Sequence, residues 1–216
     1  MYTPITVELL RVDGTDLDVV NAARCSYDAQ SHEFSERDAK LINYLAKHGH
    51  WSPLAHVGAQ FRISAPIFVA RQLVKHQVGL VLNEVSRRYV DSEPTFFKPS
   101  SWRGRPANSK QGSSGDVANQ HLYHELHDDL IENALAVYQR MIDDGVAPEQ
   151  ARMVLPLSAM TTWIWTGSLV AWSRVCHLRM AKDSQAETQV VARKIDSFLA
   201  DAFPVSWKAL MGDNND

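Results

Sequence analysis

The fold is decided by residues 56–77, which read HVGAQFRISAPIFVARQLVKHQ. Residues 56–63 have the composition of a strand, and Pro66 suits the first turn of a helix, where its missing N–H is not needed. We predict that this helix runs to about Gln77. Its apolar side would carry Ile67, Ala70 and Val74. A strand that leads directly into a helix indicates helices packed on a sheet.

The N-terminal flank repeats this order. Ile5 to Val12 alternates like a strand, and Asp16 to Arg24 has the apolar spacing of a short helix. Residues 35–38, SERD, resemble a capping box, which predicts a further helix ending at Gly49. The histidines of the following 48–50 segment, HGH, then lie at a helix exit.

The C-terminal flank is mainly helical. A long amphipathic helix is predicted from Asp116 to Asp144, followed by a helical turn that begins at Ala147. Residues 160–165 have the bulky and β-branched content of a strand. Two more helices are expected over 167–180 and 183–202. We find no internal repeat, so the prediction is one mixed α and β domain over residues 1–216.

Residues 100–115 are rich in Ser, Gly, Pro, Asn and basic side chains. A structureless loop of this length inside a compact domain needs an explanation in function or disorder. We therefore predict a functional loop here.

Composition excludes several classes of protein. The hydrophobic share of 45% and the charged share of 22% are ordinary for a globular domain, and a net charge of −3 provides no basic field for coating nucleic acid. No apolar run approaches the ~18–20 residues of a membrane span. We predict a soluble, cytoplasmic protein with no nucleic-acid or membrane partner.

The two cysteines, Cys25 and Cys176, do not lie in a zinc-type spacing, so we predict neither a disulfide framework nor a metal site. Arg24 precedes Cys25 and could activate it as a nucleophile. Burial as a small apolar side chain is the favoured interpretation of a free cysteine.

The first polar cluster is residues 71–89, RQLVKHQVGLVLNEVSRRY. Here a helix end, a glycine turn and a predicted strand follow one another, and such junctions suit anions because side-chain cations and backbone N–H groups converge. A solvated charged turn is the alternative.

The second polar cluster comprises residues 152–157, RMVLPL, and 173–187, SRVCHLRMAKDSQAE. Its arginines, Arg152, Arg174 and Arg179, are costly to bury without a partner, so each must reach solvent, a carboxylate or a ligand. Surface salt bridges with Asp183 or Glu187 are the alternative to a ligand site.

Six ordered segments carry a resemblance to a known family. They are AARCSYD at 22–28, HGHWSPLAH at 48–56, PIFVARQ at 66–72, the 75–89 stretch, RMVLPL at 152–157, and Leu178-Arg179 with Gln185 and Glu187. With them the chain resembles, nearly end to end, the flavin-dependent thymidylate synthases, which methylate deoxyuridine monophosphate (dUMP) without a cysteine nucleophile. The family signature is an Arg-His-Arg triplet, then Asn-Glu, Ser and Arg-Tyr. The corresponding residues are Lys75-His76-Gln77 and NEVSRRY at 83–89.

The resemblance implies an α+β domain with long helices packed on a mainly antiparallel sheet, and a homotetramer with shared active sites. It implies Arg179 as the principal catalytic residue, assisted by Ser86. The implied dUMP-binding residues are Gln72, Lys75, Glu84, Val85, Ser86, Arg87, Arg88, Arg152 and Arg179.

The resemblance also implies FAD as cofactor, with NADPH as reductant and methylenetetrahydrofolate as carbon donor. Residue His50 would lie near the folate entrance. The implied FAD-binding residues are Ser26, Ser52, Lys75, His76, Gln77, Val78, Glu84, Ser168, Val170 and Arg174.

The chain departs from the family pattern at several of these positions. The triplet has lost two arginines, and Arg103, Arg105 and Lys110 of the 100–115 loop could compensate. Val170 falls where an arginine is expected, and Arg174, one helical turn away, could restore that cation. Asp183 replaces a family histidine.

Two alternative functions stay open. A related enzyme would use the same pocket to make a hydroxymethylated pyrimidine nucleotide, with water intercepting the transferred carbon. The second alternative is a nucleotide- or flavin-binding protein without turnover, which the altered triplet at 75–77 makes conceivable.

Overall fold

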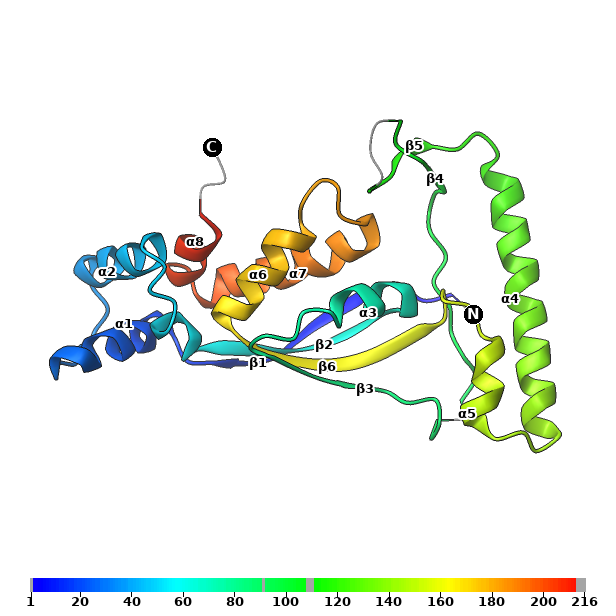
Figure 1. Cartoon of the computed structure of the whole chain (residues 1–216), viewed down its shortest axis with the longest axis horizontal. Coiled ribbons are helices and arrows are strands. Elements are labelled where there is room, and N and C mark those ends of the chain that lie inside the picture. The colour runs from blue at the N-terminus through cyan, green and yellow to red at the C-terminus, as the bar shows by residue number, and fades with distance from the viewer. Residues whose placement is uncertain (1, 91, 108–110, 213–216) are drawn as a thin grey trace.

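The computed structural model describes residues 2–90, 92–107 and 111–212. Its centre is a four-stranded antiparallel sheet in the order β1-β2-β6-β3, with helices gathered on one face (Figure 1). The strands are β1 (Thr6–Asp13), β2 (Gly58–Pro66), β3 (Leu80–Glu84) and β6 (Met160–Ser168). The predicted α+β class with a mainly antiparallel sheet is confirmed.

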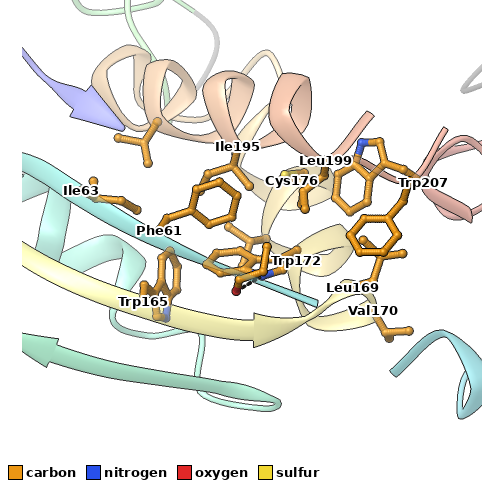
Figure 2. Packing of buried hydrophobic residues seen from close by; sticks show 14 of the residues in the cluster. Phe61, Ile63, Trp165, Leu169, Val170, Trp172, Cys176, Ile195, Leu199 and Trp207 are labelled. Carbon is orange, nitrogen blue, oxygen red and sulfur yellow. Dashed lines mark hydrogen bonds between the residues drawn. The ribbon is translucent and has the colours of Figure 1, made fainter. Parts of the chain in front are cut away.

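The covered face of the sheet carries the core. Phe61 and Ile63 of β2 and Trp165 of β6 are fully buried against α6 (Leu169–Arg179) and α7 (Ala186–Ala202) (Figure 2). Trp172 of α6 lies edge-on to Phe61 and to Trp165, with ring centroids 5.0 and 4.9 Å apart. Its indole N–H donates to the carbonyl of Ala59 at 3.2 Å, so burial leaves that polar group satisfied.

The opposite face is polar. Residues that alternate with the core positions, such as Gln60, Ser64 and Thr166, are only partly buried, and Gln60 donates to the Thr166 hydroxyl at 2.8 Å across the β2–β6 pair. Alternation on a pleated strand places one residue set inward and the next outward. The sheet is therefore covered by this chain on one face.

The N-terminal predictions are confirmed. Helix α1 (Asp16–Arg24) has the predicted bounds, and a short turn, η1 (Cys25–Tyr27), follows it. Helix α2 (Glu36–Lys47) begins at a capping box in which the Asp38 carboxylate accepts from the backbone N–H and hydroxyl of Ser35. It exits through Gly49, whose φ of 69° favours glycine. The turn η2 (Pro53–Ala55) leads into β2.

The predicted helix after Pro66 is shorter than expected. Helix α3 (Ile67–Leu73) begins as predicted but stops before Lys75 and His76, so the prediction of a helix to Gln77 was wrong. The chain must turn sharply into β3, and Gly79 supplies a φ of 76° that only glycine adopts easily. The segment 74–79 is therefore a turn.

The 100–115 segment forms a hairpin of β4 (Arg103–Gly104) and β5 (Ser114–Asp116), and Lys110 lies outside the described residues. Helix α4 (Gln120–Asp143) stands at one end of the molecule beside the short α5 (Pro148–Ala151) (Figure 1). The turn η3 (Arg152–Val154) follows α5. The closing helix α8 (Ser206–Met211) was not predicted, because six residues carry too little periodic signal.

Cys176 is buried and Cys25 is exposed, so the favoured interpretation of Cys25 as a buried apolar residue was wrong. Burial raises the pKa of the Cys176 thiol, which keeps it protonated and unreactive. None of the helices within the described residues is both long and apolar enough to span a membrane.

Candidate active site

Arg179 ends α6 and points its guanidinium at the exit of α3. Its Nε–H donates to His76 Nε2 at 2.9 Å, and its Nη2 donates to the backbone carbonyl of Gln72 at 3.3 Å. A guanidinium has five N–H donors in a rigid fork, so donors remain for a ligand. Burial lowers the pKa of Arg179, although a guanidinium stays charged at neutral pH.

The Arg179–His76 contact requires a neutral imidazole, because the ring nitrogen must accept. Burial, and then the charge of Arg179, lower the pKa of His76 from its ordinary value of 6.5. The turn that follows α3 therefore holds His76 as a hydrogen-bond acceptor and not as a cation.

We expect this contact to make stability fall with acid. In the folded state His76 takes up a proton only at a pH below 6.5, whereas in the unfolded state it does so at its ordinary pKa. The contribution of the contact to the free energy of unfolding is therefore complete above pH 6.5. It is lost as the pH falls through the pKa of the folded state. The difference in unfolding free energy between the wild type and His76→Gln should shrink from about pH 7.5 to about pH 5 in urea titrations. A difference independent of pH would contradict this account.

A cavity of about 470 Å³ opens beside this cation, and we call it the Arg179 pocket. Its lining includes Gln72, Arg103, Ser113, Arg179, Asp183, Ser184 and Gln185. The Ser184 hydroxyl is buried and has no hydrogen-bond partner among the described residues. An unsatisfied buried hydroxyl at the wall of a polar cavity is suited to a ligand or water.

The β4–β5 hairpin closes one side of the Arg179 pocket. A Cβ at Gly112 would lie 3.4 Å from the backbone of Asp183, so the hairpin packs on the loop between α6 and α7 (Figure 1). Arg103 of β4 forms an ion pair with Glu187 at 2.6 Å and donates to Ser113 at 2.8 Å. Glu187 therefore forms a salt bridge, but with Arg103 and not with one of the three arginines considered from the sequence.

A second cavity, of about 310 Å³, lies at the end of β3, and we call it the Arg152 pocket. Four predicted nucleotide-binding residues line it: Glu84, Val85, Arg87 and Arg152. Glu84 accepts from the Thr161 hydroxyl at 2.6 Å, and Arg152 is exposed, with its Nε–H on the Glu149 carbonyl at 3.2 Å. Two arginines beside oriented hydroxyls suit a phosphate.

Ser86 and Arg88 follow β3 directly. The Ser86 hydroxyl accepts from the backbone N–H and the Nε–H of Arg88 at 3.3 and 3.2 Å. The Arg88 guanidinium lies 5.0 Å from the centroid of the Tyr89 ring, which is exposed. These groups are near the Arg152 pocket in sequence but do not line it.

The predicted site residues therefore divide. Gln72 and Arg179 line one pocket, and Glu84, Val85, Arg87 and Arg152 line another. Among the described residues, neither of these two cavities contains both the predicted catalytic arginine and the predicted phosphate arginine.

Part of the predicted cofactor set lies at the start of α6. The 74–79 turn packs there, since a Cβ at Gly79 would lie 3.3 Å from the Ser168 hydroxyl. The turn η2, next to Ser52, also contacts α6. Ser26 lies apart from them in η1, beyond the C-terminal end of α1, and Glu84 lies in the Arg152 pocket. His50 is exposed at the exit of α2. Among the charged members of the set, Lys75 and Arg174 have no partner among the described side chains.

The prediction that Val170 and Arg174 reach a common ligand is wrong. Val170 is buried at 6% exposure in the core, whereas Arg174 is exposed, so their side chains do not reach a common ligand (Figure 2). In the described part of the chain, no group of three or more His, Cys, Asp or Glu side chains is arranged to hold a metal ion.

Sequence reasoning missed the Arg103–Glu187 pair and the unsatisfied Ser184. The basic residues of the 100–115 segment were a signal for the first, because a cation there needs a carboxylate or a ligand. No signal in the sequence distinguishes Ser184 from other serines, since its isolation is a property of packing.

A helix-covered antiparallel sheet with arginine-lined pockets at its strand and helix ends is suited to bind a small anionic molecule. The chain belongs to the thymidylate synthase complementing protein family, whose model matches residues 8–205. Flavin-dependent thymidylate synthases are among its relatives, which confirms the resemblance. That of Thermus thermophilus is 36% identical over 94% of this chain and 74% of the relative, and that of Kosmotoga olearia is 35% identical over 95% and 89%.

Solved structures agree with the family. The UMP/dUMP methylase PolB from Streptomyces cacaoi, bound with 5-Br dUMP, has a TM-score of 0.87 at 30% identity and covers 96% of this chain and 95% of its own. The same methylase bound with 5-Br UMP has a TM-score of 0.84 at 31% identity.

Proposed function

We propose that this enzyme methylates dUMP to dTMP, using methylenetetrahydrofolate as the carbon donor, FAD as cofactor and NADPH as reductant. The observation that carries the proposal is the Arg179 pocket, in which an oriented arginine and three glutamines line a cavity within a fold similar to that of a UMP/dUMP methylase bound with 5-Br dUMP. A pyrimidine ring offers carbonyl oxygens to such donors.

Arg179 is the catalytic residue of the proposal. A guanidinium beside the uracil ring stabilises the negative charge that develops on the ring oxygens, and this raises the nucleophilicity of C5 toward the one-carbon unit. His76 accepts from Nε and the Gln72 carbonyl accepts from Nη2, so the cation is oriented before the substrate arrives. Little reorganisation is then needed during the reaction.

The Arg152 pocket is the proposed phosphate site. Arg87 and Arg152 supply charge, Glu84 faces the sugar, and Val85 lines the same cavity. Ser86 and Arg88 directly follow these residues without lining the cavity, and we place them beside the bound nucleotide. Since these residues lie outside the Arg179 pocket, we propose that each active site combines the Arg179 pocket of one subunit with the Arg152 pocket of another. This requires a homo-oligomer, which we propose to be a tetramer.

Helix α4 supports assembly. Four apolar side chains follow one another at helical spacing and are about half exposed: Leu122 at 46%, Leu126 at 53%, Leu130 at 53% and Val137 at 49%. An apolar stripe of this length on a helix at the end of the molecule is costly in water and suits contact with another subunit.

The side chains of the predicted cofactor residues have a chemistry that fits FAD. Lys75 and Arg174 provide cations without partners in the described part of the chain, and Ser26, Ser52, Gln77 and Ser168 add hydroxyl and amide groups. This donor set suits the diphosphate and ring edges of a flavin dinucleotide. When bound, the flavin supplies the hydride that completes the methyl group.

The test is turnover of purified protein with FAD, NADPH, methylenetetrahydrofolate and either dUMP or UMP, with the nucleotide product measured by mass spectrometry. We expect the methylated product from dUMP. A hydroxymethyl product would replace the proposal with the hydroxymethylase, methylation of UMP alone would change the substrate, and bound FAD without any product would leave a binding protein.

A further inference from the structure

Glu187 has a position that the proposed function does not use. Its side chain is 8% exposed, and both carboxylate oxygens are engaged. Oε1 accepts from Arg103 at 2.6 Å, and Oε2 accepts from the Gln185 side-chain amide at 3.1 Å. A carboxylate paired with a guanidinium can only accept, so Gln185 must turn its NH₂ group toward Glu187.

The orientation of Gln185 fixes that of Gln72, which lines the Arg179 pocket. With its NH₂ group on Glu187, Gln185 presents its carbonyl oxygen to Gln72, whose NH₂ group donates to it. The carbonyl oxygen of Gln72 accepts from the Thr188 hydroxyl at 3.1 Å. One carboxylate thus decides which end of each amide is donor and which is acceptor.

Gln72 keeps capacity for a ligand. A side-chain amide has two N–H donors and two lone pairs, and the contacts described here use one of each. Gln72 also lines the cavity that Arg179 enters. Because Gln72 lines the cavity, fixing its amide also fixes where its remaining N–H and lone pair lie.

The two pyrimidines differ in this pattern. Uracil carries a carbonyl acceptor at position 4 and an N–H at position 3, whereas cytosine carries an amino donor and a ring acceptor there. A site with fixed donors and acceptors rejects the base whose groups are reversed, because buried polar groups are left unpaired. Inverting the amide would exchange these preferences.

We propose that Glu187 is a specificity-determining positioning residue, which, through Gln185, fixes the Gln72 amide so that the pocket accepts a uracil and rejects a cytosine nucleotide. This inference rests on the proposed function, because it places the base beside Arg179. Glu187 acts through other side chains and does not itself touch the nucleotide.

The test is direct binding of dUMP and of dCMP to the FAD-loaded protein by calorimetry. In Glu187→Gln, the new amide can still accept from Arg103 but offers an N–H to Gln185, which favours inversion of both glutamines. We expect the ratio of dCMP to dUMP dissociation constants to fall by about tenfold or more. Glu33→Gln, which removes an equal charge at an exposed position, should leave the ratio unchanged.

A second variant distinguishes a change of specificity from misfolding of the Glu187→Gln protein. Gln185→Leu removes the link but leaves the Arg103–Glu187 ion pair, and it should lower the same ratio because the Gln72 amide can then adopt either orientation. Equal weakening of both nucleotides, an unchanged ratio, or a wild type that prefers dCMP would overturn the inference. A wild type that binds neither nucleotide would instead contradict the proposed function.

Discussion

Replacing Arg179 with alanine is expected to lower turnover of dUMP by about 10²–10³-fold, the usual effect of removing an electrostatic contact to developing charge. The variant loses the donor that faces the cavity together with its contacts to His76 and Gln72. Steady-state kinetics with dUMP and calorimetry of dUMP binding separate the effect on the chemical step from the effect on binding. We expect kcat to fall more than binding.

The matched control is Arg193→Ala, which removes an exposed arginine on α7 whose contact is with Gln189 at 2.8 Å. It should keep wild-type turnover. Arg179→Lys should not restore activity, since an ammonium cannot donate to His76, to the Gln72 carbonyl and to a ligand in fork geometry. Turnover of Arg179→Ala within a few fold of wild type would remove Arg179 from the catalytic role.

Mixed oligomers are expected to recover activity that neither parent has. Arg179→Ala alters only the Arg179 pocket, and Arg152→Ala alters only the Arg152 pocket. If each site joins the pockets of two subunits, co-expression leaves about a quarter of the sites with both arginines, given random assembly of a symmetric oligomer. Turnover should rise from nearly zero in each parent to about that fraction of wild type.

The control for this experiment uses two variants of the same pocket. Gln72 and Arg179 both line the Arg179 pocket, so mixing Gln72→Ala with Arg179→Ala leaves no intact site and should restore nothing. Failure of the first mixture, with both chains shown in one oligomer by mass spectrometry, would place the two arginines in a site made by one chain.

Much of the fold could be predicted because its signals are local. The capping box at Ser35, the strand alternation before Pro66 and the long amphipathic pattern of α4 each specify an element within one stretch of chain. The end of α3 could not be predicted in the same way, because the sequence remains compatible with a helix through His76. The 74–79 turn is instead tied to a distant element, since the backbone N–H of Ser168 donates to the Gly79 carbonyl at 3.2 Å.

The candidate site was predicted as a set of residues but not as a geometry. The motif resemblance identified Gln72, Arg152 and Arg179, yet nothing in their spacing indicates that they divide between two cavities. The prediction that Val170 and Arg174 reach a common ligand was wrong for a related reason. An interval of one helical turn places two side chains on one face but does not say where that face ends against the core.

By itself the sequence determined the class of fold, the family and the chemical character of the site, because strand alternation, capping and the order of motifs are written in neighbouring residues. Only the tertiary structure decided that Arg103 pairs with Glu187, that His76 accepts from Arg179, and that Ser184 lacks a partner among the described residues. Each of these facts depends on groups far apart in the chain. Their hydrogen bonds and burial are set only when the helices pack on the sheet.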